Sequence, residues 1–168
     1  MEEMRAFFTR RVEGYDEHML QNVAGCAEGY ALLAQNLPDG AEDVLDLGCG
    51  TGLELDAMLA KRRDLRVTGV DLTQAMLDEL KKKHPEANLR LICGDYFQTD
   101  FGSECFDCAV SFESLHHFSR EKKLGLYRRI CEALCPGGVF LNGDYMVESE
   151  EEAKQQLAEA NLRLVVSV

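Results

Sequence analysis

The sequence has no long hydrophobic segment. None of its apolar runs approaches the ~20 residues that a bilayer-spanning helix needs. The first five residues, Met1-Glu2-Glu3-Met4-Arg5, also lack the charged stretch followed by an apolar stretch that is typical of an export signal. These two absences predict a cytoplasmic protein that does not associate with a membrane.

Basic residues are scarce relative to acidic ones. The chain has 18 Lys and Arg against 30 Asp and Glu, and its formal net charge is −12. Such a field repels a polyanion, so a nucleic acid is disfavoured as substrate or partner. The basic clusters at 61–63 and 81–83 both fall at predicted helix ends, where cations interact favourably with the helix dipole.

Paired cysteine motifs are also few. The chain has seven cysteines, an odd number, and a single C-x-x-C spacing between Cys105 and Cys108. A structural zinc site needs four ligands, and the other candidate pair, Cys131 and Cys135, lies on a predicted helix at a position relative to the first pair that the sequence does not give. We therefore expect reduced structural thiols and no metal site.

What the chain does contain is enough apolar sequence for one domain. It has 168 residues, of which 46% are hydrophobic, and no internal repeat or low-complexity linker. Residues 1–38 are predicted to form a helical cap, with helices at 4–12 and 16–33, the second capped by Asp16. These helices either cover a ligand site as a lid or pack against the edge of the sheet, and the sequence does not decide which.

Residues 41–168 are predicted to form an α/β core. Strands alternate with helices, which indicates a doubly wound, mostly parallel sheet with right-handed crossovers. The expected strands lie at about 43–47, 65–71, 88–95, 106–112, 139–145 and 162–166. The expected helices lie at about 53–62, 73–83, 119–134 and 149–161, the last of which opens on the capping box Ser149-Glu150-Glu151-Glu152.

The first strand leads into the most informative stretch, Val44 to Gly52. A short apolar strand is followed by glycines at three alternate positions, which lets a ligand approach the main chain. The dinucleotide pattern G-x-G-x-x-G is excluded because Leu53 or Leu55 stands where it needs glycine, and a P-loop is excluded because the turn has no lysine. What remains is Asp46-x-Gly-x-Gly-x-Gly52, and the alternative is an ordinary strand-to-helix turn.

Acidic residues end the next two strands. In a doubly wound sheet these strand ends lie beside the first, where Asp71 can accept both hydroxyls of a ribose. Asp95 can accept a hydrogen bond from an adenine amine, and Leu72 and Tyr96 can supply faces for the base. The alternatives are a helix cap for Asp71 and a turn for Asp95.

Along nearly the whole chain these residues resemble the class I S-adenosylmethionine-dependent methyltransferases. The resemblance rests on five segments, which are 44–52, 67–73, 94–96, 106–118 and 134–140. It implies a Rossmann-like methyltransferase fold, S-adenosyl-L-methionine as cofactor and a small-molecule methyl acceptor. It also implies a set of cofactor-binding residues, namely Tyr15, Asp46, Gly48, Cys49, Gly50, Asp71, Leu72, Gly94, Asp95, Tyr96, Ser111 and Phe112.

Within that set, the resemblance implies separate roles. Gly48 and Gly50 would contact the methionine part of the cofactor, Asp71 its ribose and Asp95 its adenine. Ser111 and Phe112 would line the pocket near the sulfonium, and Tyr15 would close the site from the N-terminal side.

The reaction requires little from the protein beyond alignment of the acceptor and exclusion of water. A base is needed only if the acceptor must first lose a proton, and His116 and His117 are the candidates. The alternative for both is a packing role. Glu113 is a candidate to bind a cationic acceptor.

The end of the sequence departs from the family pattern. In the family a sixth strand is followed by an antiparallel seventh, which inserts between strands five and six. Here a single strand follows the fifth, so we expect either a shortened fragment or a homodimer in which a partner covers the apolar edge. Two other functions stay open: a non-catalytic binder of S-adenosylmethionine or S-adenosylhomocysteine, and a nicotinamide-dependent oxidoreductase, which Leu53 disfavours.

Overall fold

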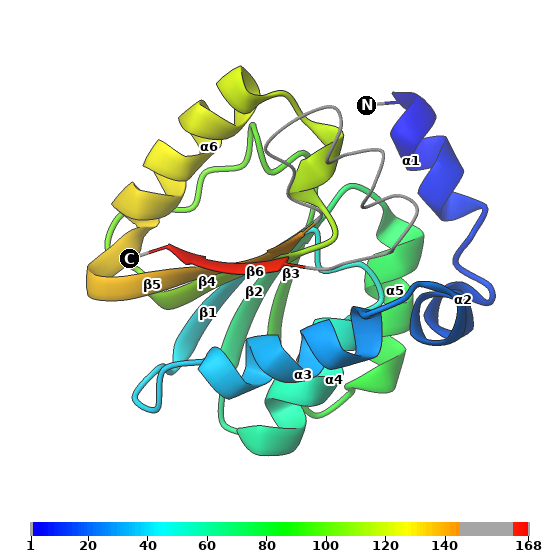
Figure 1. Ribbon diagram of the computed structural model, residues 1–168, viewed down its shortest axis with the longest axis horizontal. Helices are drawn as coiled ribbons and strands as arrows, with labels where there is room; N and C mark the ends of the chain where they lie inside the picture. Colours follow the sequence, from blue (N-terminus) through cyan, green and yellow to red (C-terminus); the bar gives the residue numbers. More distant parts are fainter. Residues whose placement is uncertain (1, 145–162, 168) are drawn as a thin grey trace.

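The fold is a six-stranded sheet with helices on both faces (Figure 1). The computed structural model describes residues 2–144 and 163–167. The strand order is β3-β2-β1-β4-β5-β6, and β1 to β5 run parallel. The strands are β1 (Asp43–Leu47), β2 (Arg66–Asp71), β3 (Asn88–Cys93), β4 (Phe106–Phe112), β5 (Leu134–Asp144) and β6 (Arg163–Ser167). This arrangement confirms the predicted doubly wound, mostly parallel sheet.

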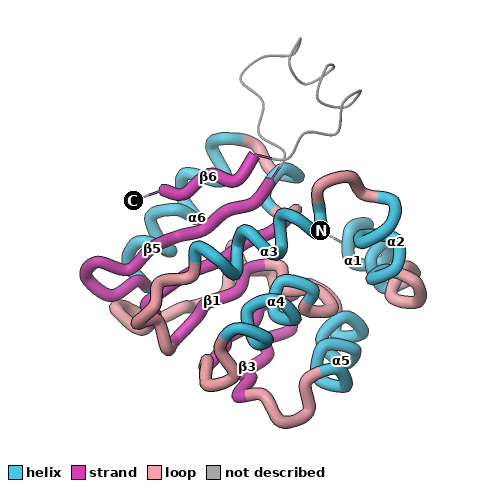
Figure 2. Tube along the Cα trace, turned by 60° about the horizontal axis from the view of Figure 1, so that its bottom comes forward, coloured by secondary structure: helices cyan, strands magenta, loops and turns pink. Residues whose placement is uncertain are grey.

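The helices are divided between the two faces of the sheet (Figures 1 and 2). One face carries α3 (Cys26–Asn36), α4 (Leu53–Lys61) and α5 (Gln74–Lys83), and the other carries α6 (Arg120–Ala133). Two further helices, α1 (Glu2–Thr9) and α2 (Tyr15–Asn22), lie beyond one end of the strands. Among the described residues, no helix combines the length and the apolar character that a membrane crossing requires.

Each face of the sheet has its own buried core, because strands covered on both sides are apolar on both sides. The α3–α5 face buries five side chains completely beneath the three helices, namely Leu33, Val44, Leu55, Met58 and Leu80. The α6 face buries Leu45, Leu47, Ala109, Leu126 and Ile130. The alternation of Val44 and Leu45 between the two cores follows from the period of two in a strand.

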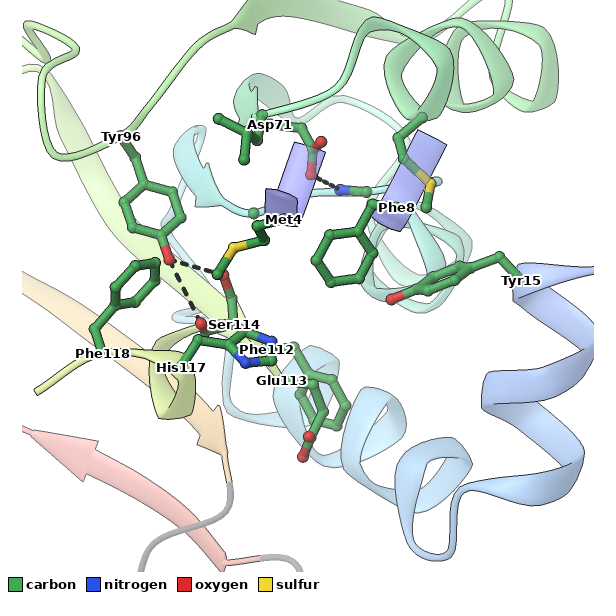
Figure 3. Close-up of a pocket in the computed structure, with 14 residues that line it drawn as sticks. Met4, Phe8, Tyr15, Asp71, Tyr96, Phe112, Glu113, Ser114, His117 and Phe118 are labelled. Carbon is green, nitrogen blue, oxygen red and sulfur yellow. Dashed lines mark hydrogen bonds between the residues drawn. The ribbon is translucent and has the colours of Figure 1, made fainter. Parts of the chain in front are cut away.

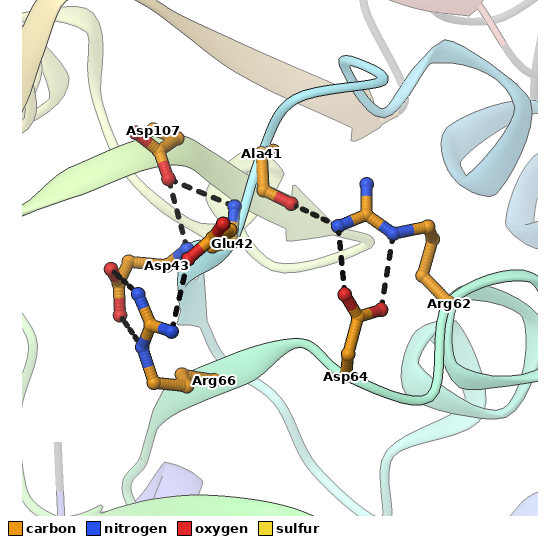
Figure 4. A network of polar contacts seen from close by, with 7 residues as sticks. All are labelled: Ala41, Glu42, Asp43, Arg62, Asp64, Arg66 and Asp107. Atoms are coloured by element: carbon orange, nitrogen blue, oxygen red, sulfur yellow. Dashed lines mark hydrogen bonds and ion pairs between the residues drawn. The ribbon is translucent and has the colours of Figure 1, made fainter.

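A polar network fixes the beginning of β1 at the end of the sheet away from the glycine turn (Figure 4). The Arg66 guanidinium donates to both carboxylate oxygens of Asp43, at 2.7 and 2.5 Å, and to Glu42 at 3.1 Å. The backbone N–H groups of Glu42 and Asp43 donate to the Asp107 carboxylate at 2.8 and 3.0 Å. These bonds set β1 in register between β2 and β4.

Three details differ from the sequence prediction. The helix expected at 16–33 is two helices, because Val23 is extended (ψ 107°) and Gly25 is left-handed (φ 81°). Asp16 does not cap α2, which begins at Tyr15 after Gly14. The fifth strand begins at Leu134 rather than 139, with an irregularity opposite Phe106 and Cys108.

The last strand runs antiparallel to its neighbour in the sheet. β6 pairs antiparallel with β5, with Phe140 opposite Ser167 and Asp144 opposite Arg163. Its place and direction are those that the family resemblance gives to the antiparallel seventh strand. The helix expected at 149–161 lies outside the described residues. β6 is the edge of the sheet, and its pairing with a second copy stays a prediction.

Candidate functional site

The glycine turn follows β1 and is held by the end of β2. The N–H groups of Gly48 and Cys49 both donate to the Val70 carbonyl, at 2.8 and 3.3 Å. Gly48 has a φ of 82°, and a Cβ added there would lie 2.3 Å from the Ser114 Oγ. Only glycine meets both conditions, so the turn brings bare main chain to the surface of the site.

Asp71 ends β2 directly beside this turn. Its Oδ2 accepts the Gly50 N–H at 3.0 Å (Figure 3), and its Oδ1 accepts the Thr73 N–H and Oγ–H, both at 2.8 Å. Burial raises the pKa of Asp71, and these hydrogen bonds oppose the shift. The carboxylate is therefore fixed at the mouth of the glycine turn. Its bonds to Thr73 at the start of α5 resemble those of a helix cap, so Asp71 combines both positions that the sequence allowed.

A cavity of about 60 Å³ lies between the turn, Asp71 and the segment that follows β4 (Figure 3). Nine residues predicted from the sequence line it, namely Tyr15, Gly48, Gly50, Asp71, Leu72, Tyr96, Phe112, Glu113 and His117. The other lining residues are Met4, Phe8, Met76, Ser114 and Phe118. The wall thus combines one fixed carboxylate and exposed main chain with aromatic and methionine side chains.

Helix α1 supplies part of this wall. Met4 and Phe8 project into the cavity, and the Phe8 ring lies 6.4 Å from Tyr15 and 6.3 Å from His117 between centroids (Figure 3). Ligand pockets commonly measure roughly 300–1,000 Å³, so with α1 in this position the cavity is smaller than a cofactor of nucleoside size needs. That the N-terminal helices act as a lid stays a prediction.

The opposite wall is the segment after β4. Phe112 packs on Tyr30 at 4.3 Å between centroids, and Glu113 takes a left-handed backbone with a φ of 48°. The Ser114 hydroxyl lies 3.0 Å from the Tyr96 hydroxyl, which ties this segment to the loop after β3. Burial, and then the charge on Asp144, raises the pKa of Glu113 to about 7.

The two adjacent histidines differ in their surroundings. His117 lines the cavity, and burial followed by the nearby His116 lowers its pKa. The His116 ring lies 3.9 Å from that of His117, but its Nδ1 lies 2.5 Å from the Asp144 Oδ1. Burial disfavours the charged form of His116, but the hydrogen bond to Asp144 and the charge of its carboxylate together favour that form more strongly. The pKa of His116 is therefore raised. Only His117 faces the space where an acceptor would bind.

Six predicted residues do not line the cavity: Asp46, Cys49, Gly94, Asp95, Ser111 and His116. Their predicted contact with cofactor or acceptor stays a prediction. The Ser111 Oγ donates to the Leu47 carbonyl at 3.2 Å, so it links β4 to β1. The Asp95 Oδ1 accepts the Phe97 N–H at 2.9 Å, which is the turn that sequence reasoning gave as the alternative. The Cys49 side chain is fully buried and packs against Gly69.

Asp46 forms a buried acid pair with Glu54 beneath the turn. Their exposed fractions are 0% and 5%, and neither Asp46 carboxylate oxygen has a hydrogen-bond partner among the described residues. Burial raises the pKa of Asp46 to about 8, and burial together with the charge on Asp46 raises that of Glu54. The pair therefore keeps a proton at neutral pH.

A polar latch joins the cap to the glycine turn. The Thr51 Oγ–H donates to the Asp16 Oδ1 at 2.5 Å, and Lys83 contacts the Asp16 Oδ2 at 3.0 Å. Lys83 also contacts the Asp56 Oδ2 at 2.9 Å. Asp16 on α2, Asp56 on α4 and Lys83 on α5 thus meet next to the turn, which explains why Asp16 is not a helix cap.

Comparison with known proteins gives a match over the region that contains these motifs. Residues 44–138 match the family model described as "Methyltransferase domain". The chain belongs to the methyltransferase domain family. The resemblance inferred from the sequence motifs is therefore confirmed, and this membership supports S-adenosylmethionine as cofactor.

Individual members of the methyltransferase family share part of their length with this chain. It is 32% identical over 130 residues to the erythromycin 3''-O-methyltransferase of Saccharopolyspora erythraea, covering 72% of this chain and 42% of that protein. It is 33% identical over 131 residues to the cypemycin N-terminal methyltransferase of a Streptomyces species, covering 76% of this chain and 51% of that protein. The chain thus spans about half the length of these curated relatives.

A solved structure described as a DhpI-SAM-HEP complex has the same fold. It superposes with a TM-score of 0.73 at 21% sequence identity, and the match covers 99% of this chain and 81% of that one. At this identity the comparison establishes the fold of the methyltransferase domain and nothing finer.

Proposed function

We propose that this domain binds S-adenosylmethionine at the glycine turn and transfers its methyl group to a small-molecule acceptor. One observation carries the proposal. The Asp71 carboxylate, fixed by the Gly50 N–H at 3.0 Å, lies on one wall of the cavity that Glu113 and His117 line on the other. A cofactor site and an acceptor site therefore share one space.

The residues at the turn fit the cofactor in chemical type. The Asp71 Oδ2 accepts one hydrogen bond and has room for another from a ribose hydroxyl. Gly48 and Gly50 present main chain without side chains, and Tyr96 and Phe118 offer aromatic faces to a base. Admission of a ligand requires Met4 and Phe8 to move with α1.

The chemistry assigns few tasks to the protein. When bound, S-adenosylmethionine supplies a methyl group on a sulfonium that a nucleophile displaces in line. Phe112 and Phe118 line the cavity with apolar rings, which disfavour water next to the reacting groups. His117 is placed to take a proton from the acceptor at its imidazole, while His116 is turned onto Asp144 and positions the segment.

Two observations support a small-molecule acceptor. The erythromycin 3''-O-methyltransferase, one of the relatives, carries a small molecule in its name. The net charge of −12 opposes binding of a nucleic acid.

The test is methyl transfer from isotopically labelled S-adenosylmethionine to a panel of small alcohols and amines, read by mass spectrometry. We expect a labelled product whose formation falls by about 10²–10⁴-fold in His117→Ala, because a positioned base is removed. Binding of S-adenosylhomocysteine should be kept in this variant. S-adenosylhomocysteine binding with no transfer to any acceptor would instead favour the non-catalytic binder.

A further inference from the structure

Three side chains with metal-ligating atoms meet where β4 and β5 end. Glu113 follows β4, Asp144 ends β5, and His116 lies in the short helix η1 (Leu115–His117). One ligand atom from each lies within 4.8 Å of the other two. We call these three residues the acid–imidazole cluster.

The acid–imidazole cluster is more buried than acidic groups at a protein surface usually are. The side chains of Glu113 and Asp144 are 8% and 1% exposed, and that of His116 is 27% exposed. Two carboxylates are thus held close together with one imidazole between them. Like charges so placed repel each other, and burial removes the water that would screen them.

One atom of the cluster is independent evidence for a bound ligand. The Glu113 Oε1 is buried and has no hydrogen-bond partner among the described residues, although its Oε2 lies 3.7 Å from the His116 Nδ1. A buried carboxylate oxygen without a partner is costly, and such atoms in native structures call for a bound water or ion.

The distances between these ligand atoms are close to those around one bound ion. Two ligand atoms that are each ~2.1 Å from a common metal lie roughly 3.0–4.2 Å apart, according to the angle between them. The separation between Glu113 and His116 falls in this range, and the 2.5 Å contact between His116 and Asp144 needs to open by about half an ångström. Carboxylate oxygens suit Mg²⁺ and Mn²⁺, and imidazole suits Zn²⁺ and Fe²⁺.

We propose that Glu113, His116 and Asp144 bind a divalent cation. Because Glu113 also lines the cavity, the ion lies at the wall where an acceptor oxygen could become a further ligand. The site is independent of the glycine turn and of Asp71, so cation binding does not rest on methyl transfer.

The test is titration of the purified full chain with Mn²⁺, in which electron paramagnetic resonance counts the free ion. We expect one bound Mn²⁺ per chain, at least tenfold weaker binding in Glu113→Gln and in Asp144→Asn, and displacement by Zn²⁺ or Mg²⁺. Glu121→Gln is the control, because Glu121 is an exposed acid at the start of α6, and it should bind Mn²⁺ as the wild type does.

Two readouts keep the result decisive. Circular dichroism and S-adenosylhomocysteine calorimetry on the same samples show whether each variant is folded, and the isosteric Glu113→Gln decides the matter if Asp144→Asn does not fold. Wild-type chain that binds no Mn²⁺, Zn²⁺ or Mg²⁺ up to millimolar concentration would overturn the proposal, as would equal Mn²⁺ binding in wild type and Glu113→Gln. Either result leaves the S-adenosylhomocysteine measurement, and thus the proposed function, untouched.

Discussion

The latch next to the glycine turn makes a sharp prediction about Lys83. Its ammonium lies 3.0 Å from Asp16 and 2.9 Å from Asp56, and its side chain is 26% exposed. Replacing Lys83 with Met keeps the length of the side chain and removes the charge. It leaves the carboxylates of Asp16 and Asp56 facing each other without the cation between them.

The expected loss follows from these contacts. Partly exposed ion pairs contribute about 0.2–1 kcal/mol each, and two such pairs give roughly 0.4–2 kcal/mol. For a domain of this size 1 kcal/mol corresponds to about 2–4 °C in Tm, so Lys83→Met should unfold about 1–8 °C below the wild type. The difference should shrink in 1 M salt, because salt screens the charges.

The matched control is the neighbouring lysine. Lys82 pairs with Glu79 at 2.6 Å on the same helix, but its side chain is 70% exposed. Lys82→Met should change the free energy of unfolding by at most about 0.5 kcal/mol. Scanning calorimetry of both variants decides the matter: equal losses in Lys82→Met and Lys83→Met would refute the latch. Amide hydrogen exchange in α2 should rise only in Lys83→Met, because Asp16 lies on that helix.

Three further predictions concern the turn and its surroundings. Gly48→Ala should lower the free energy of unfolding in urea by roughly 2–4 kcal/mol, since its Cβ would lie 2.3 Å from the Ser114 Oγ at a φ of 82°, and a loss below 1 kcal/mol would contradict this. Glu54→Gln should stabilise the protein relative to the wild type, and the benefit should grow as pH rises from 5 to 8. In the wild type the folded state holds a proton on the acid pair, whereas the unfolded chain has released it above the ordinary carboxyl pKa, so folding becomes more costly as pH rises. Each unit by which folding raises the pKa corresponds to about 1.4 kcal/mol. Urea unfolding at several pH values checks the sign, and a benefit that falls with pH would refute it. Phe8→Ala should tighten S-adenosylhomocysteine binding about fivefold, since roughly 1 kcal/mol of ring burial no longer opposes opening of the cavity; weaker binding would mean that Phe8 holds the ligand.

The glycine turn and its partner carboxylate could be predicted because local rules determine them. Alternate glycines after an apolar strand need no tertiary information, and strand order in a doubly wound sheet places the end of β2 beside the end of β1. Asp71 therefore lies where the sequence predicted it, within hydrogen-bonding distance of Gly50. The strands and most helices were likewise predictable from their apolar periodicity.

The rest depended on contacts that have no sequence pattern. Met4 and Phe8 reach the cavity only because α1 folds back over the ends of the strands, and nothing in their spacing indicates this. Asp16 looked like a helix cap and instead meets Thr51 and Lys83, which are distant in the sequence. Two adjacent histidines could not be told apart until Asp144 was placed beside one of them.

Calorimetric titration with S-adenosylhomocysteine tests the central claim most directly, on the wild type and on Asp71→Asn. Removing the charge of a carboxylate that accepts ligand hydroxyls costs about 1.5–3 kcal/mol, so we predict binding to the wild type and binding about 10- to 150-fold weaker in Asp71→Asn. NAD should give no heat of binding. Equal S-adenosylhomocysteine affinity in the two proteins, or NAD binding without S-adenosylhomocysteine binding, would contradict the assignment of Asp71 and the glycine turn as the cofactor site.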